Sequence, residues 1–165
     1  MSALENRIAI ITGSSTGIGA GVAEAFAVEG ATVIVNYPDV SELQNAQDVL
    51  NKIIKLSPKS QIIQANVSNE EEVISMIDEV NSNHGTIDIL VNNAGIATSA
   101  LVHEMTANMW DELISIHLKG TFLCTREVLK IMYEKNYGKI INTASQLAYK
   151  GSAGFSHYTA AKGAI

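Results

Sequence analysis

The sequence has a single cysteine, few basic residues and no long apolar run, and each shortage excludes a class of protein. Cys124 is the only cysteine among 165 residues, which excludes an intrachain disulfide and suits a reducing compartment. The eleven lysines and arginines are scattered along a chain of net charge −6. This argues against a nucleic-acid partner, because phosphate neutralisation needs clustered basic side chains. No apolar run approaches about 18 residues, and the first residues lack the apolar core of a signal peptide. We therefore expect a cytoplasmic protein with no membrane partner.

The composition is that of an ordinary globular protein with a substantial core. Apolar residues make up 47% of the chain and charged residues 17%. A length of 165 residues suits one domain over 1–165. The chain contains no internal repeat, low-complexity tract or linker.

Short apolar runs rich in valine and isoleucine alternate with amphipathic segments. A capping box at Ser68–Glu71 predicts the start of one helix and Gly85 its end, and a long helix is predicted over 108–135. Near-continuous apolar content is typical of strands covered on both faces, as in a parallel sheet. The predicted strands are 8–12, 31–36, 61–65, 87–91 and 139–143. This alternation predicts an α/β fold with a doubly wound, Rossmann-like parallel sheet.

A glycine-rich turn follows the first predicted strand and precedes an alanine-rich helix. Glycines let the backbone approach a pyrophosphate, and the start of a helix offers unpaired N–H groups and a positive dipole end. The alternative is a plain tight turn between strand and helix. The residues expected to bind the phosphates of a dinucleotide are Gly13, Ser15, Thr16, Gly17, Ile18 and Gly19.

Near the end of the chain, Tyr158 and Lys162 are four residues apart, and Ser145 lies thirteen residues before the tyrosine. Residues at this spacing share one face of a helix, with Cβ atoms about 5–6 Å apart. A free phenol, with a pKa near ~10, is a poor base at neutral pH. An ammonium about 6 Å away favours the phenolate by nearly 3 kcal/mol at an effective dielectric of ~20. The pair is therefore typical of proton transfer beside a cofactor.

Taken together and in this order, the motifs resemble those of the short-chain dehydrogenases/reductases. They are TGSSTGIG at 12–19, NNAG at 92–95, Ser145, and Tyr158 with Lys162. The resemblance covers about 8–165 and is similar in strength for glucose dehydrogenases, acetoin/diacetyl reductases and 3-oxoacyl-carrier-protein reductases. It implies an NAD(P)-dependent oxidoreductase that interconverts a secondary alcohol and a ketone, a small-molecule substrate, and no metal.

The resemblance also implies roles for the three residues near the end of the chain. Tyr158 acts as general acid/base, while Lys162 makes the phenol more acidic and binds the nicotinamide ribose. Ser145 orients the carbonyl oxygen of the substrate. Its alternative is a hydroxyl that satisfies a backbone group at the end of a strand.

Two further segments are implied to border the cofactor. Asn93, Ala94 and Gly95 line its channel through their backbone, with the asparagine side chains stabilising the turn. Asn66 and Val67 contact the adenine. Relatives commonly carry aspartate where this chain has Asn66, whose amide carbonyl could still accept the adenine amino hydrogen.

His117 stands where many relatives have an asparagine that helps to form a proton relay. An imidazole can hydrogen-bond water, which keeps a relay possible. A single histidine among leucines and isoleucines is as often a satisfied core residue. Both interpretations stay open from the sequence.

The choice between NAD and NADP is assigned to the end of the second strand. An acidic residue at Asn36 would favour NAD through the ribose diol, and a nearby arginine would favour NADP. This chain has neither, and Thr16 stands where NADP-preferring relatives often carry arginine. Asp39 is unfavourable to a phosphate, so the prediction is NAD or NADP with a slight preference for NAD.

Relatives continue beyond the segment that matches this chain. They add the rest of the tyrosine–lysine helix, two further strands and a loop that covers the substrate. We therefore expect 1–165 to be the N-terminal portion of such an enzyme or the product of a truncated gene model, with an uncovered edge at the fifth strand. The alternative function is a nucleotide-binding fragment without catalysis, and the full-length form is expected to be a homo-oligomer.

Overall fold

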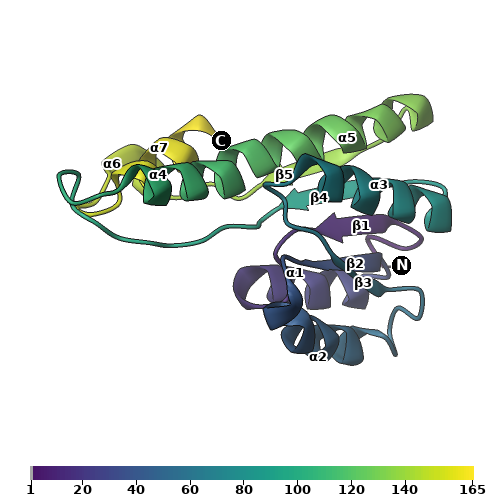
Figure 1. The fold of residues 1–165 in the computed structure, drawn as a ribbon. Coiled ribbons are helices and arrows are strands. Elements are labelled where there is room, and N and C mark those ends of the chain that lie inside the picture. The colour runs from purple at the N-terminus through teal and green to yellow at the C-terminus, as the bar shows by residue number, and fades with distance from the viewer. Residues whose placement is uncertain (1) are drawn as a thin grey trace.

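A computed structural model describes residues 2–165, in which five parallel strands form one sheet between two layers of helices (Figure 1). The order of the strands across the sheet is β3-β2-β1-β4-β5. Every neighbouring pair is parallel, with Ala9 of β1 opposite both Val33 of β2 and Ile89 of β4. This confirms the predicted Rossmann-like architecture. The strands are β1 (Ile8–Ile11), β2 (Thr32–Tyr37), β3 (Gln61–Gln64), β4 (Ile89–Asn92) and β5 (Lys139–Asn142).

The helices cover both faces of the sheet. In Figure 1, α1 and α2 lie below the strands, α3 and α5 lie above them, and α4, α6 and α7 gather at the left. No helix within residues 2–165 is long and apolar enough to cross a membrane. The α-helices are α1 (Gly17–Val28), α2 (Leu43–Ile53), α3 (Glu70–His84), α4 (Ala107–Ile114), α5 (Gly120–Lys135), α6 (Leu147–Lys150) and α7 (Ser156–Ala164).

The core consists of two apolar layers, one on each face of the sheet. Successive side chains of a strand point to opposite faces, so Ile10 packs in the layer toward α3 and α5, whereas Ile11 packs toward α1 and α2. Both side chains are fully buried. Burying one such side chain contributes about 1.5–3 kcal/mol. This explains why β1, which lies at the centre of the sheet, is apolar at every position.

The start of α3 differs by one residue from the prediction. The N-cap is Asn69, not Ser68, because the Asn69 side chain accepts hydrogen bonds from the backbone N–H groups of Glu71 and Glu72. The Ser68 hydroxyl donates instead to the side-chain oxygen of Asn66, 2.8 Å away. Gly85 ends the helix as predicted, with φ at +74°.

The long helix predicted over 108–135 is interrupted. Residues Ser115–Lys119 form a π-helical turn between α4 and α5. π-Helical turns are rare in proteins, and many of those that occur lie at functional sites. This one contains His117, which the sequence analysis singled out for a different reason.

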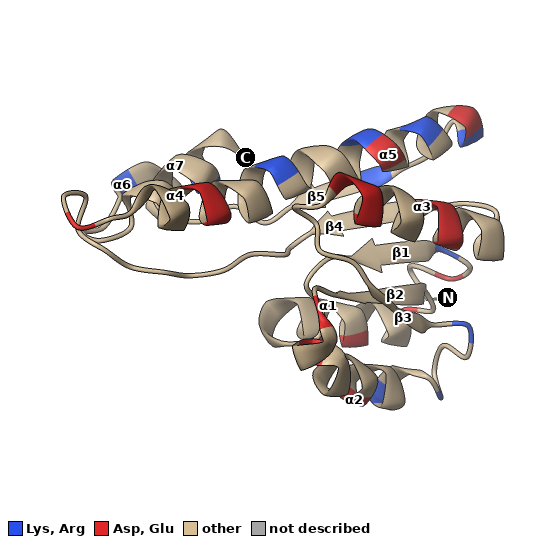
Figure 2. Ribbon diagram, in the orientation of Figure 1, with Lys and Arg blue, Asp and Glu red and all other residues tan. Residues whose placement is uncertain are grey.

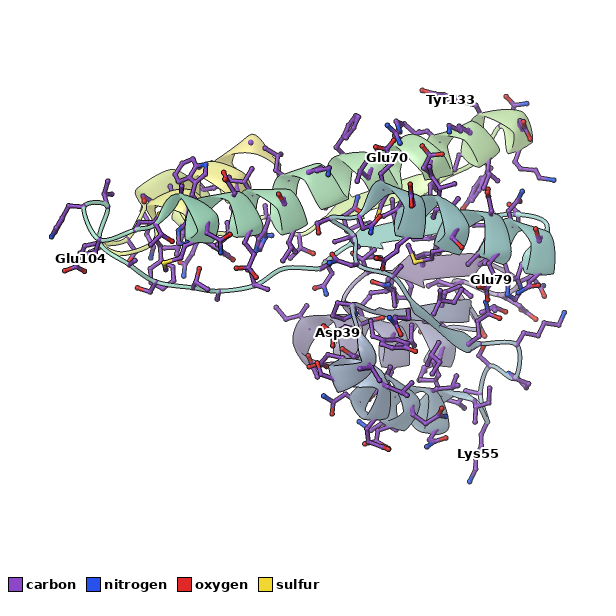
Figure 3. All side chains as sticks on the ribbon, in the orientation of Figure 1. Asp39, Lys55, Glu70, Glu79, Glu104 and Tyr133 are labelled. Carbon is purple, nitrogen blue, oxygen red and sulfur yellow. The ribbon has the colours of Figure 1, made fainter. Side chains whose placement is uncertain are left out.

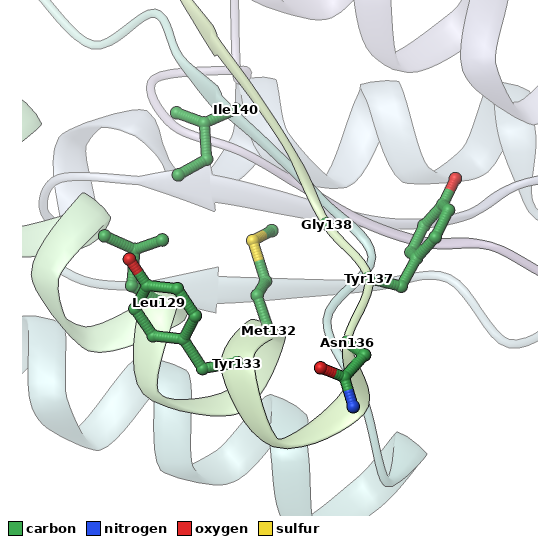
Figure 4. A pocket seen from close by; sticks show the side chains of 7 residues that line it. All are labelled: Leu129, Met132, Tyr133, Asn136, Tyr137, Gly138 and Ile140. Carbon is green, nitrogen blue, oxygen red and sulfur yellow. The ribbon is translucent and has the colours of Figure 1, made fainter.

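β5 is an edge strand of the sheet, as the sequence predicted, and an apolar groove runs beside it. Ile141 is 47% exposed, and Ile140 is only partly covered. Figure 4 shows the groove between the end of α5 and β5. Its lining residues are Leu129, Met132, Tyr133, Asn136, Tyr137, Gly138 and Ile140. An edge with exposed apolar side chains favours pairing with another chain.

We expect Ile141→Lys to weaken self-association of the chain, because a charge on an edge strand opposes edge-to-edge pairing. The concentration at which association begins should rise roughly tenfold, since losing an apolar contact of ~1.5 kcal/mol changes an association constant by about that factor. Sedimentation velocity over a concentration series measures it. Val28→Lys, on an exposed residue at the end of α1, is the control and should change nothing. Equal association of both variants would mean that β5 is not the surface that associates.

Candidate cofactor and active site

Three glycines give the turn between β1 and α1 its shape. Gly13 and Gly17 have φ values of +60° and +58°, which favour glycine. A Cβ at Gly13 would lie 2.8 Å from the Ala94 Cα, and one at Gly19 would lie 2.5 Å from the Asn93 Nδ2. A Cβ at Gly17 would meet nothing within 4 Å. Gly13 and Gly19 therefore allow close packing of protein against protein, and Gly17 is the glycine with open space beside it. The sequence interpretation had given the close approach of the cofactor to all three.

Hydrogen bonds join this turn to the end of β4. The Asn93 Nδ2 donates to the carbonyl oxygens of Thr12 (2.9 Å) and Gly13 (3.0 Å). The Thr12 hydroxyl accepts from the backbone N–H groups of Asn93 and Ala94, both at 3.0 Å, and donates to the Val91 carbonyl. The Asn93 side chain thus fixes the two strand ends relative to each other, in line with its expected structural role.

Asn36 has a structural role that the sequence did not predict. Its side chain is buried, with 1% exposed. The Oδ1 accepts from the Gly13 N–H at 3.0 Å, and the Nδ2 donates to the carbonyl oxygens of Ala65 (2.9 Å) and Ile63 (3.4 Å). The amide is bonded to the backbone of the turn and of the chain at the end of β3. Asn36 also lines the cavity described below, so its part in cofactor choice stays a prediction, made by a side chain whose amide is already bonded to the protein.

The side chain of Asn66 is also bonded within its own turn. Its Oδ1 accepts from the backbone N–H and the hydroxyl of Ser68, at 3.0 and 2.8 Å. These bonds use the oxygen that the sequence analysis offered to adenine. Val67, the next residue, packs against Gly120, where a Cβ would lie 2.7 Å from the Val67 Cγ2.

A cavity of about 550 Å³ connects these segments at the carboxyl ends of β1, β2, β3 and β4. Three carboxylates line it, and its lining contains no lysine or arginine. Figure 2 shows red and no blue where the chain passes from β2 to α2, and Figure 3 labels Asp39 there. Of the predicted turn and channel residues, only Gly19 lies outside the lining. The lining residues are Gly13, Ser15, Thr16, Gly17, Ile18, Asn36, Pro38, Asp39, Glu42, Ala65, Asn66, Val67, Asn93, Ala94, Gly95, Ile96, Glu112 and Ile116.

Glu42, Glu112, Ile96 and Ile116 are the lining residues that the sequence analysis missed, together with Pro38 and Ala65. The sequence contains a feature that points to Glu42. An acidic residue about 20 positions after the glycine turn is typical of a ribose contact, and the only acidic residues near that distance are Asp39 and Glu42.

Tyr158 and Lys162 lie on the same face of α7, as their spacing predicted. The Lys162 Nζ is 5.9 Å from the centroid of the Tyr158 ring and donates to the Thr143 carbonyl oxygen at 2.5 Å. Lys162 is almost fully buried, and burial lowers the pKa of its ammonium group. The lysine is thus held between β5 and the phenol.

Ser145 lies after β5, at the start of the short helix α6. Its Oγ accepts from the Leu147 N–H at 3.2 Å. This bond matches the alternative considered for Ser145, in which its hydroxyl satisfies a nearby backbone group. The hydroxyl hydrogen can still be donated, since a serine hydroxyl both donates and accepts.

His117 connects Ile96, which lines the cavity, to the tyrosine. Its Nε2 accepts from the Ile96 N–H at 3.0 Å and lies 2.8 Å from the Ile96 carbonyl oxygen. Its ring is edge-on to that of Tyr158, with centroids 5.4 Å apart. Gly95 makes room for it, because a Cβ there would lie 2.3 Å from the His117 Cε1. Within residues 2–165, the His117 Nδ1 is buried without a hydrogen-bond partner.

A second buried histidine, which the sequence analysis did not single out, fastens the loop after β4 to α7. The His157 Nε2 lies 2.9 Å from the Thr98 hydroxyl. The Ala100 N–H donates to the Gly154 carbonyl oxygen at 3.0 Å. These bonds attach the long connection between β4 and α4 to the segment that precedes Tyr158.

Comparison with known proteins gives the family of this chain. A family model described as short chain dehydrogenase matches residues 7–165. The chain therefore belongs to the short-chain dehydrogenase family of oxidoreductases.

Individual relatives agree with the family. The chain is 39% identical over its whole length to a 3-oxoacyl-[acyl-carrier-protein] reductase of Synechocystis sp., and it covers 66% of that protein. It is 40% identical over its whole length to the uncharacterized oxidoreductase YxbG of Bacillus subtilis, and it covers 59% of that protein. A crystal structure from Sinorhizobium meliloti, named for a short-chain alcohol dehydrogenase, superposes with a TM-score of 0.90 at 32% identity, over 98% of this chain and 63% of the other. The chain thus spans about two thirds or less of the length of these relatives.

We expect Asn36→Asp to destabilise the fold. At neutral pH a carboxylate would face the carbonyl oxygens of Ile63 and Ala65, and two donated hydrogen bonds would be lost. The expected loss is about 2–3 kcal/mol in the free energy of unfolding, measured by urea denaturation. Asn108→Asp, on an exposed residue in the first turn of α4, should stay within about 0.5 kcal/mol. An equally small change for Asn36→Asp would show that the buried amide bonds contribute little.

We also expect His117 to make the fold less stable in mild acid. Burial lowers the pKa of its imidazole, although the bond to Ile96 acts in the other direction. As the pH falls through about 6.5, the imidazole of the unfolded chain takes up a proton, while that of the folded chain resists protonation. The free energy of unfolding therefore falls below about pH 6.5. The slope attributable to one proton is at most about 1.4 kcal/mol per pH unit.

His117→Asn should flatten this dependence, because an amide can bond to both backbone groups of Ile96 without titrating. Urea denaturation from pH 7.5 to 5 measures the difference from the unmodified chain. Burial also lowers the pKa of His84, and this residue contributes equally to the pH dependence of the unmodified chain and of His117→Asn. The exposed His103→Asn serves as control. Identical slopes for all three proteins would contradict a neutral, buried His117.

Proposed function

We propose that this chain binds NAD or NADP and interconverts a secondary alcohol and a ketone by hydride transfer, with Tyr158 as general acid/base. The observation that carries the proposal is the position of His117. It is hydrogen-bonded to Ile96 at one end of the cavity and packs against Tyr158. The cavity and the phenol are therefore neighbours, which hydride and proton transfer to one carbonyl group require.

The residues of the cavity fit a dinucleotide. The space beside Gly17 opens at the start of α1, a twelve-residue helix with no acidic residue in its first turn. Unpaired N–H groups and the positive dipole end at such a position favour a pyrophosphate. The lining then continues to Ala65–Val67 on one side and to Asn93–Ile96 on the other, as an elongated ligand needs.

The cofactor, when bound, supplies the hydride chemistry, and the protein supplies position and protons. The Tyr158 hydroxyl would donate its proton to the carbonyl oxygen during reduction and recover it during oxidation. The Lys162 Nζ has three N–H donors, of which one is bonded to Thr143, so it can also donate to a ribose hydroxyl. The Ser145 hydroxyl would orient the carbonyl oxygen, and the His117 Nδ1 would relay the proton.

The names of the relatives support a 3-oxoacyl thioester as the first substrate to test. Several that are 39–40% identical to this chain are named 3-oxoacyl-[acyl-carrier-protein] reductase. Such a substrate carries the ketone that the proposed chemistry reduces. The signs of the charges that line the cavity favour NAD over NADP as its cofactor.

The proposal extends to a cytoplasmic homo-oligomer for the whole protein. Cys124 is buried and cannot form an intrachain disulfide, which suits a reducing compartment. Trp110 on α4 and Phe122 on α5 are 40% and 56% exposed, and exposed aromatic side chains are common at subunit contacts.

A nucleotide-binding unit without catalysis is the second candidate, favoured by the position of Tyr158, Lys162 and Ser145 outside the lining of the cavity. A single substitution separates the two functions. Tyr158→Phe removes only the hydroxyl, so we expect kcat to fall by about 100- to 10,000-fold while nucleotide affinity stays within about twofold. Calorimetry with NAD and NADP gives the affinity, and turnover of 3-oxoacyl thioesters and secondary alcohols gives kcat.

Tyr149→Phe is the matched control, since Tyr149 is 94% exposed and lies outside the cavity. More than a few per cent of kcat in Tyr158→Phe would remove the tyrosine from the mechanism. Nucleotide binding without turnover in the unmodified chain would support the second candidate.

A further inference from the structure

A carboxylate from the segment before α2 reaches back to the glycine turn. The Glu42 Oε2 accepts from the Ser15 hydroxyl at 2.9 Å and from the Asn45 Nδ2 at 3.0 Å. Ser15 is buried and lines the cavity, and Glu42 is half-buried and lines it too. Two hydrogen bonds thus hold the charge of Glu42 against the turn that is proposed to bind the pyrophosphate.

We infer that Glu42 is the residue that sets the nucleotide preference of this chain, by excluding the 2′-phosphate of NADP. The inference rests on the proposed dinucleotide function. The adenosine ribose of a bound dinucleotide lies between the glycine turn and the end of β2. Glu42 is bonded to the first of these segments, and Pro38 and Asp39, which follow β2, line the same cavity.

The charge of Glu42 is not neutralised by the protein. Neither Glu42 nor Asp39 takes part in any ion pair within residues 2–165. The cavity lining has no lysine or arginine that could attract a phosphate. A phosphate dianion placed here would meet like charge with no compensating cation, whereas a ribose diol could donate hydrogen bonds to the same carboxylates.

Asp39 is the competing residue, and its contacts make it the weaker candidate. Its Oδ1 accepts from the backbone N–H and the hydroxyl of Ser41, at 2.8 and 2.5 Å. Those bonds cap the short 3₁₀ turn Val40–Glu42, so Asp39 is exposed and held on its own turn. Glu42 is the carboxylate that is bonded to the glycine turn.

The decisive variant is Glu42→Gln, which keeps an acceptor for Ser15 and Asn45 and removes only the charge. Calorimetry should show NAD binding at least roughly tenfold more tightly than NADP to the unmodified chain, as expected for like-charge repulsion at a partly buried site. In Glu42→Gln the affinity for NADP should rise by about tenfold, with that for NAD unchanged within about twofold. Asp39→Asn should have the smaller effect, and Glu134→Gln, an exposed change of equal charge on α5, should have none.

A second measurement needs no variant. Raising the salt concentration from about 0.05 to 0.5 M should narrow the ratio of the two affinities in the unmodified chain, because salt screens the repulsion. In Glu42→Gln, the ratio of the NAD and NADP affinities should change less with the salt concentration. Binding of both nucleotides with a ratio that neither Glu42→Gln nor salt alters would overturn the role of Glu42 while leaving the proposed function intact. Failure of both nucleotides to bind the unmodified, folded chain would overturn the proposed function and this inference together.

Discussion

The hydrogen-bonded junction between the ends of β1 and β4 is the constraint on which the rest of the site depends. At this point the chain leaves β1 for the layer of α1 and leaves β4 for the long connection to α4, so the two segments diverge. A crevice opens where neighbouring strands continue in opposite directions. Thr12 and Asn93 hold the two sides together through bonds of 2.9–3.0 Å, and Gly13 and Gly19 let them approach. These bonds and close contacts give the cavity a defined shape at the point where the two segments diverge.

At a second position, a glycine without a side chain makes room for a polar ring, and this ring links the cavity to Tyr158. Gly95 leaves room for the His117 ring, and the ring in turn packs against Tyr158. The π-helical turn at Ser115–Lys119 contains His117. One irregular turn in a long helix thus carries the residue that joins two segments far apart in the sequence, the β4 end and α7.

The sequence predicted those features that depend on local pattern. The strands, the glycine turn and the pairing of Tyr158 with Lys162 follow from spacing along a few residues, and the structure has all of them. The hydrogen bonds of the Asn36 side chain could not be predicted, because its partners at Gly13, Ile63 and Ala65 come from two other segments.

The N-cap of α3 and the role of His157 could not be predicted from the sequence for related reasons. Asn69 rather than Ser68 caps the helix because Asn66 takes the Ser68 hydroxyl, a choice between two adjacent hydrogen bonds that the pattern does not decide. The partner of His157 is Thr98, 59 residues away. Polar side chains with distant partners are the part of the site that only the fold reveals.

The two ends of the site differ in how completely their polar groups are bonded. At the glycine turn, Thr12, Asn36 and Asn93 all bond to backbone groups. Around α7, within residues 2–165, the buried Nδ1 atoms of both His117 and His157 lack partners. Each such group costs about 1–3 kcal/mol, which a native fold tolerates where the group has another use. The glycine-turn end is therefore held by bonded polar groups, and the region near Tyr158 keeps hydrogen-bonding capacity that the proposed proton transfer would use.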